Sequence, residues 1–195
     1  MLGELAADMV PRPKISITKP HGGALTGRRV LFLTEILPCP FYTRVWQEAR
    51  TVHDAGAEVS IICPTGPGFK TRYEVIDGIH IHRHPLPLEA RRPAGFLPEY
   101  SAALFWQFTL AWRVYFGRGF DVIHAGNPPD LIFLVAGVFK IFFGIKFIYD
   151  LHDINPELYE AKFGRRNIFR RLLLRCKKWS FQLADISLVT NHSFE

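Results

Sequence analysis

Apolar residues along this chain follow two spacings that alternate from residue 29 onward. Short runs rich in apolar residues predict buried strands; they lie at 30–33, 58–63, 122–125, 147–149 and 185–190. Between these runs, apolar residues recur every third or fourth position and predict helices; these are expected at 44–55, 99–116, 129–143 and 167–183. Strands that alternate with helices predict an α/β fold of the Rossmann-like, doubly wound type, with a mainly parallel sheet and helices on both faces.

Two further strands, at 73–76 and 79–82, flank the dipeptide Asp77-Gly78, which favours a two-residue hairpin turn. They predict a hairpin at one edge of the sheet. Three histidines share one face of the second strand: His80, His82 and His84. We interpret this face as the exposed, polar side of an edge strand. A metal site is the alternative, but no further cysteine or carboxylate nearby obviously completes it.

The two ends of the chain depart from the repeating pattern. Residues 1–27 contain prolines and glycines without a sustained spacing, so we expect a flexible leader, and they lack the early apolar run of a secretory signal. Residues 28–195 are expected to form one folded domain. The last predicted strand is followed by a helix start at 191–193 and the sequence stops at Glu195. We therefore expect this domain to be incomplete and a second domain to be missing.

Composition supports one large core, because 48% of the 195 residues are apolar. The three cysteines are widely spaced and odd in number, which suits packing in a reducing compartment better than a disulfide framework or a zinc site: Cys39, Cys63 and Cys176. The most apolar stretch, 131–149, is interrupted by Lys140, Gly144 and Lys146. Its pieces are shorter than the roughly 20 residues of a membrane span. We expect a buried helix and a buried strand there.

Ligands of a doubly wound sheet bind at the carboxyl ends of its strands. The loop after the first strand, 35–40, has no glycine-rich phosphate turn, which argues against a dinucleotide-binding domain. No Walker loop is present either. Polar residues do follow two later strands, at 126–130 and 150–157. These two loops are the candidate site.

Four segments occur in a set order: Arg-Val-Trp-Gln-Glu-Ala-Arg at 44–50, Gly-Ala-Glu-Val at 56–59, Asp-Val-Ile-His-Ala at 121–125 and Tyr-Asp-Leu-His-Asp at 149–153. Together they resemble the amino-terminal domain of family 4 glycosyltransferases of the GT-B type, over about 29–195. The resemblance implies that this lobe grips the acceptor and that a carboxy-terminal lobe binds the nucleotide-sugar. It also implies a retaining, hexosyl-type transfer, no cofactor bound by this lobe, and little activity of this lobe alone.

One loop departs from the family pattern. Many members place paired glycines after the first strand, whereas this chain has Pro38-Cys39-Pro40-Phe41-Tyr42. Whether this loop contacts the donor phosphates is therefore left open by the resemblance.

The resemblance assigns the catalytic position to His152, which matches a family histidine near the transferred sugar. Its ring can donate and accept hydrogen bonds; a purely structural bond is the alternative. Three carboxylates are candidates for holding acceptor hydroxyls or assisting proton transfer: Asp150, Asp153 and Glu157. The alternatives are a helix cap for Asp153 and the anchoring of a neighbouring loop for Asp150. Asn127 and Arg44 are further substrate-binding candidates, for which structural roles stay equally open.

The formal charge of +6 points to anionic partners. Much of it lies between residues 161 and 183, which contain eight basic residues and no acidic one: Lys162, Arg165, Arg166, Arg170, Arg171, Arg175, Lys177 and Lys178. A basic face opposite an apolar one suits an anionic membrane surface, with these contacts: Arg166, Arg170, Arg171, Arg175 and Lys178. A solvated basic face is the alternative. Nucleic acid is disfavoured because no known readout motif accompanies the charge.

The sequence thus predicts the acceptor-binding lobe of a nucleotide-sugar-dependent glycosyltransferase at the cytoplasmic face of a membrane. A lipid-linked or polysaccharide acceptor is expected, with the donor-binding lobe in cis or on a second chain and with no metal ion. The alternative is a non-catalytic, membrane-associated scaffold derived from such an enzyme.

Overall fold

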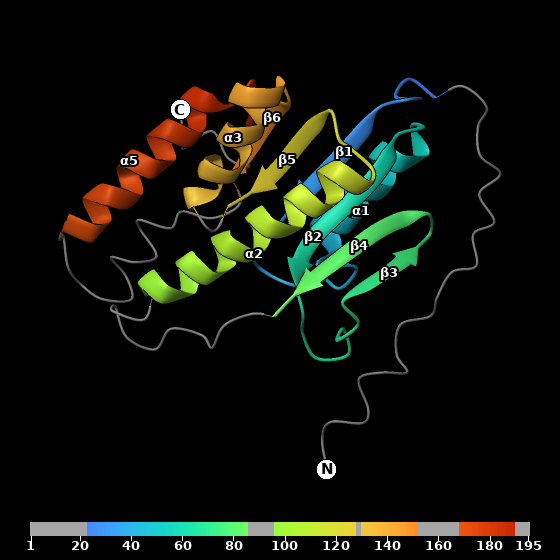
Figure 1. The fold of residues 1–195 in the computed structure, drawn as a ribbon, viewed down its shortest axis with the longest axis horizontal. Helices are drawn as coiled ribbons and strands as arrows, with labels where there is room; N and C mark the ends of the chain where they lie inside the picture. The colour runs from blue at the N-terminus through green and yellow to red at the C-terminus, as the bar shows by residue number, and fades with distance from the viewer. Residues whose placement is uncertain (1–22, 86–95, 128–129, 152–167, 190–195) are drawn as a thin grey trace, which may run out of the picture.

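The computed structural model describes residues 23–85, 96–127, 130–151 and 168–189, which contain a seven-stranded sheet of order β3-β4-β2-β1-β5-β6-β7 (Figure 1). The strands are β1 (Arg29–Leu33), β2 (Glu58–Pro64), β3 (Tyr73–Ile76), β4 (Ile79–His84), β5 (Val122–Gly126), β6 (Lys146–Leu151) and β7 (Ile186–Val189). Neighbouring strands are parallel except in the β3–β4 hairpin. The predicted sheet and its edge hairpin are confirmed.

Helices cover both faces of the sheet, as predicted. The helical segments are α1 (Thr43–Asp54), α2 (Phe96–Gly117), the short 3-10 helix η2 (Asp130–Ile132), α3 (Phe133–Phe143) and α5 (Ile168–Leu183). In Figure 1, α2, α3 and α5 lie in front of the sheet and α1 lies behind it. Alternation along β1 supplies both cores: Leu31 and Leu33 join the α2–α3 side, while Val30 and Phe32 join the α1 side.

Turn residues set several boundaries of these elements. Asp77 and Gly78 have φ angles of 50° and 82°, the left-handed backbone that a tight hairpin requires. Gly144 ends α3 with a φ angle of 69°, and the apolar stretch 131–149 is therefore a helix followed by a strand, as expected. The helix is not buried on all sides as expected, because Ile141 and Phe142 are exposed. Within the described ranges no helix is long and apolar enough to cross a membrane.

The packing of α3 against α5 depends on a glycine and a lysine. A Cβ atom at Gly137 would lie 3.0 Å from Leu183 Cδ2, so the missing side chain lets the two helices approach closely. Lys140 Nζ donates to the carbonyl of Leu183 at 2.7 Å and to Asp185 at 2.8 Å. The bond from Lys140, together with the backbone N–H of Phe147, lowers the pKa of Asp185 to about 2.

The folded part of the chain begins before residue 28. Gly23–Gly27, which the sequence assigns to the leader, form a turn in which the Leu25 N–H donates to the Ala55 carbonyl at 2.9 Å. The Leu25 side chain packs against the core on the α1 side. Residues 1–22 lie outside the described residues.

Two further expectations about burial are wrong. β7 was expected to be buried, but its side chains are exposed, Ile186 by 55%. The reason is that β7 is an edge strand in the described sheet and pairs only with β6. His82 and His84 do not lie on an exposed face: His82 is half-buried and His84 fully buried, because α2 packs across β4. The three cysteines are all buried, as expected of packing residues.

Candidate functional site

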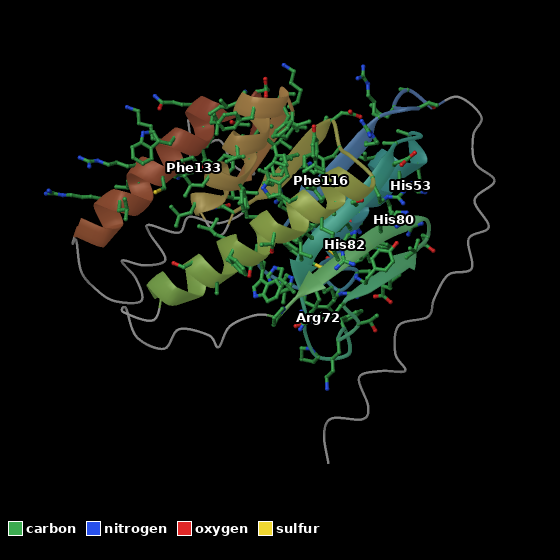
Figure 2. All side chains as sticks on the ribbon, in the orientation of Figure 1. His53, Arg72, His80, His82, Phe116 and Phe133 are labelled. Atoms are coloured by element: carbon green, nitrogen blue, oxygen red, sulfur yellow. The ribbon has the colours of Figure 1, made fainter. Side chains whose placement is uncertain are left out.

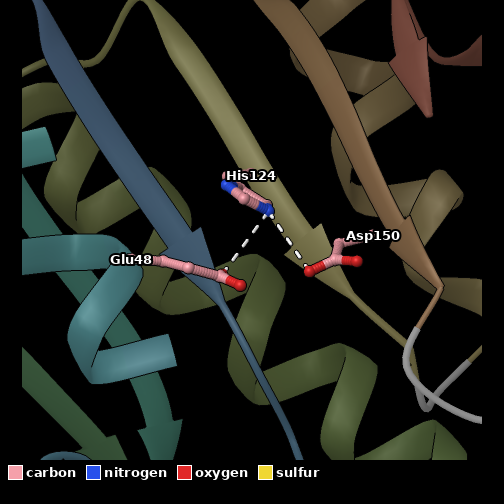
Figure 3. Close-up of side chains that lie close together, drawn as sticks. All are labelled: Glu48, His124 and Asp150. Atoms are coloured by element: carbon pink, nitrogen blue, oxygen red, sulfur yellow. Dashed lines mark ion pairs between the residues drawn. The ribbon is translucent and has the colours of Figure 1, made fainter. Parts of the chain in front are cut away.

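A cluster of charged side chains lies where the order of the strands reverses, between β1 and β5 (Figure 3). The chain leads from β1 through α1 to the β2 side, and later from β5 to the β6 side. Arg44 and Glu48 come from the first turns of α1, one helical turn apart. His124 comes from the middle of β5, and Asp150 from the carboxyl end of β6. This is the region where doubly wound folds bind ligands.

Asp150 is the centre of the cluster. Its side chain is completely buried, and both carboxylate oxygens accept from Arg44 Nη2 at 2.9 Å. Arg44 also donates from Nε to Glu48 Oε1 at 3.2 Å. Burial would lower the pKa of Arg44, but the charges of Asp150 and Glu48 outweigh this effect and raise it. The guanidinium therefore stays charged between two carboxylates that lie far apart in the sequence.

His124 faces both carboxylates without reaching hydrogen-bond distance. Its Nε2 atom is 3.7 Å from Asp150 Oδ2 and 3.9 Å from Glu48 Oε2. His124 Nε2 and Glu48 Oε2 are both buried and have no hydrogen-bond partner among the described residues. The ring of Phe32 lies beside the imidazole, with 4.8 Å between the ring centroids. Both distances exceed that of a hydrogen bond, so the imidazole faces the two carboxylates without a direct bond to either.

The same three side chains have the donor types of a metal site. Their nearest ligand atoms all lie within 4.8 Å of one another, and a histidine with two carboxylates is a set that divalent ions accept. Arg44 stands against this use, because its positive charge already pairs with both carboxylates. The geometry therefore fits a hydrogen-bonding cluster better than a metal centre.

The structure brings together three of the residues that the sequence proposed for substrate binding. Arg44 pairs with Asp150, and the buried Asn127 donates its backbone N–H to the Asp150 carbonyl at 3.1 Å. The other three candidates lie outside the described residues: His152, Asp153 and Glu157. Asp150 does anchor a neighbouring element, α1, which was the structural alternative.

Sequence reasoning missed Glu48 and His124 as members of the cluster. A signal was present for each. Glu48 follows Arg44 at the i+4 spacing of a helical ion pair. His124 interrupts the apolar strand 122–125 at a position that faces away from Ile123 and Ala125, so a polar neighbour was to be expected there.

Of the five basic residues predicted to contact a membrane, the structure describes the side chains of three. Arg171, Arg175 and Lys178 are exposed on α5. Arg166 and the side chain of Arg170 lie outside the described residues.

A second cluster of polar side chains lies at the loop after β1, where many family members have paired glycines. Glu35 Oε2 accepts from Gln107 Nε2 on α2 at 2.7 Å and lies 3.0 Å from His84 Nε2 on β4. Burial would lower the pKa of His84, but the interaction with Glu35 outweighs it and raises the pKa. Beside it, the buried Arg83 donates to the Cys39 carbonyl. The loop is thus held to β4 by side chains.

The fold and the cluster define a Rossmann-like lobe with a polar site at its strand ends, and comparisons with known proteins agree with this class. The family model of glycosyltransferase family 4 matches residues 43–194. The chain therefore belongs to glycosyltransferase family 4, and its fold is one lobe of a GT-B enzyme.

Two solved structures align with the chain. A sucrose-phosphate synthase from Thermosynechococcus elongatus aligns with a TM-score of 0.63 at 14% identity, over 84% of this chain and 42% of the synthase. The chain thus spans less than half of the length of that protein. The C-terminal domain of a hydrogenase from Pyrococcus furiosus aligns with a TM-score of 0.46 at 13% identity, over 68% of this chain and 96% of that domain. No curated protein matches the chain in sequence.

Proposed function

We propose that this lobe binds the acceptor of a nucleotide-sugar-dependent glycosyl transfer. One observation carries the proposal: Arg44, Glu48, His124 and Asp150 meet at the reversal of strand order, immediately before the segment that contains His152. Charged side chains that are already fixed by one another can hold hydroxyl groups in place at little entropic cost. The loops that follow β5 and β6 would then contact the acceptor.

The chemistry would be divided between this lobe and a donor-binding lobe, in cis or on a second chain. We assign to His152 a hydrogen bond to the transferred sugar or to charge that develops during transfer. Asp153 and Glu157 would hold acceptor hydroxyls with Asn127. Retention of the anomeric configuration and transfer of a hexose are part of the proposal, and the chain's membership of the family supports them. This lobe by itself is proposed to bind acceptor but not to catalyse transfer.

The acceptor is proposed to be attached to a lipid or to a growing polysaccharide at the cytoplasmic face of a membrane. Support comes from α5, whose exposed Arg171, Arg175 and Lys178 point away from the core. A basic residue near an anionic bilayer contributes about 1 kcal/mol to binding. Arg166 and Arg170 are proposed as further basic contacts with the membrane.

The test is a transfer assay with the full-length gene product, a panel of nucleotide-sugars and a membrane lipid extract. His152→Ala is expected to lower turnover at least a hundredfold and to leave the melting temperature unchanged, because the loss falls on the transition state. His80→Ala is the matched control, since His80 contacts Tyr73 on the distant β3–β4 hairpin. Near-normal turnover of His152→Ala would remove that residue from the mechanism.

The competing scaffold function predicts a different result in the same assay. A scaffold would bind membrane lipid but would neither bind nor consume any nucleotide-sugar. Isothermal titration of each nucleotide-sugar, with mass spectrometry of any chain that co-purifies, separates the two. Binding and consumption of one donor supports the transferase; lipid binding with no donor binding supports the scaffold.

A further inference from the structure

Helix α3 is apolar on the side that faces solvent as well as on the side that faces the sheet. Val135, Ala136 and Phe139 are buried in the core. On the outer side, Leu134 is 51%, Ile141 71% and Phe142 74% exposed. A helix that is apolar all round is normally covered on both sides, in a core or by lipid. The described residues cover only one side of α3.

Shallow grooves lie on both sides of this exposed stripe. The larger, of about 450 Å³, runs between α3 and α5 and is lined by Leu134, Ile141, Phe142 and Trp179, among others. The smaller, of about 410 Å³, runs between α3 and α2 and is lined by Leu104, Phe105 and Leu134, among others. Figure 2 shows Phe133 between α3 and α5, and Phe116 on α2 near its carboxyl end, where it is 78% exposed. The apolar surface is therefore continuous across three helices. We call the outer surface of α2, α3 and α5 the helical face.

The charges along these helices are almost all positive. The sequences of α2, α3 and α5 contain a single acidic residue, Glu99. They contain seven basic residues: Arg113, Lys140, Arg170, Arg171, Arg175, Lys177 and Lys178. Lys140 is paired with Asp185, whereas Arg113, Arg171, Arg175 and Lys178 are exposed. An exposed apolar stripe bordered by exposed cations complements an anionic bilayer, which offers hydrocarbon beneath negative headgroups.

We infer that the helical face lies in the interfacial layer of an anionic bilayer, with Leu134, Ile141, Phe142 and Trp179 inserted below the headgroups. This inference adds an insertion surface to the basic contacts of the proposed function and rests on that function only for the nature of the acceptor. A second copy of the chain is a poorer occupant, because a two-fold contact would bring the basic residues of both copies together. A helix in this position lies in the plane of the membrane and does not span it.

Vesicle sedimentation tests the inference with the full-length gene product. Wild type is expected to bind vesicles that contain 30% phosphatidylglycerol and to bind pure phosphatidylcholine vesicles at least tenfold more weakly. Ile141→Ser combined with Phe142→Ser should reduce binding to the anionic vesicles at least tenfold, because both side chains would lose their lipid contacts. Both residues are more than two-thirds exposed, so folding should tolerate the change. Tyr73→Ser combined with Val75→Ser, on exposed positions of β3, is the matched control and should bind like wild type.

Depth of insertion gives a second readout. Lipids brominated along the acyl chain should quench the tryptophan fluorescence of a variant in which every tryptophan except Trp179 has been replaced. The same lipids should not quench a variant that keeps only Trp46, which lies on α1 behind the sheet. Equal binding by the Ile141/Phe142 variant, no quenching of Trp179, or a dimer that this variant abolishes would each overturn the inference.

The outcome is separable from that of the proposed function. Transfer to a short-chain acceptor in detergent does not need vesicles. If the Ile141/Phe142 variant keeps this activity and loses vesicle binding, both proposals stand. If wild type binds vesicles through the helical face but transfers no sugar to any acceptor, only the transferase fails.

Discussion

Arg44 occupies a position that helix stability alone would not select. It lies in the first turn of α1, where the positive end of the helix dipole repels a cation, and α1 has no acidic residue in that turn. Asp150 and Glu48 compensate for this repulsion from outside the first turn. A local preference that is overruled by a distant partner is expected at functional sites.

Removing the charge of Asp150 should therefore destabilise the fold. Asp150→Asn leaves Arg44 with a neutral partner in a buried position, and we expect the free energy of unfolding to fall by about 2 kcal/mol. Asp121→Asn is the control, because Arg29 and Asp121 are 41% and 32% exposed, whereas Asp150 is fully buried; the Arg29–Asp121 pair should be worth less than about 1 kcal/mol. Urea unfolding measures both. Equal losses would mean that burial adds nothing to the Arg44–Asp150 pair.

At the scale of elements, β4 carries two histidines whose pKa values are shifted in opposite directions. Burial under α2, with Arg113 nearby, lowers the pKa of His82 to about 4. The pKa of His84 is raised, since Glu35 outweighs the effect of burial. The same strand therefore holds one histidine that resists protonation and one that favours it.

These two directions give opposite dependences of stability on pH. The folded-state pKa of His82 lies below its unfolded value, so protonation favours unfolding, and its effect destabilises as pH falls from about 6.5 toward 4. The folded-state pKa of His84 lies above its unfolded value, so its contribution is present below about pH 6.5 and is lost as pH rises through the raised pKa. His84→Asn should cost more stability at pH 5.5 than at pH 8.5, and His82→Asn less. Urea unfolding at both pH values checks this, and identical losses at both would contradict the assignment.

Element boundaries were predictable because they depend on local rules. The hairpin at Asp77-Gly78 and the helix end at Gly144 follow from backbone preferences that each residue carries by itself. The burial of His82 and His84 was not predictable from β4, because it depends on where α2 crosses the sheet. The cluster around Asp150 was partly predictable: strand ends were marked, but the contribution of α1 requires the three-dimensional arrangement.

At the scale of the whole molecule, order should decrease from the centre of the sheet to its edges. β1 lies between β2 and β5 and has no exposed residue, whereas β7 pairs only with β6 and is exposed throughout. Amide hydrogen exchange of β7 should therefore be faster than that of β1, because opening an edge disrupts one ladder and little core. Mass-spectrometric exchange on peptides from both strands measures this. Equal protection of both peptides would show that the sheet opens only as one unit.

The bond between Arg44 and Asp150 also has a consequence for the history of the sequence. The two residues are 106 positions apart, and a change at either position alone would break the charge-assisted hydrogen bonds between them. Related sequences are therefore expected to vary at these positions jointly, with a neutral residue at 44 wherever 150 is neutral. An alignment in which the two positions vary independently would show that the ion pair is a feature of this chain and not of its lineage.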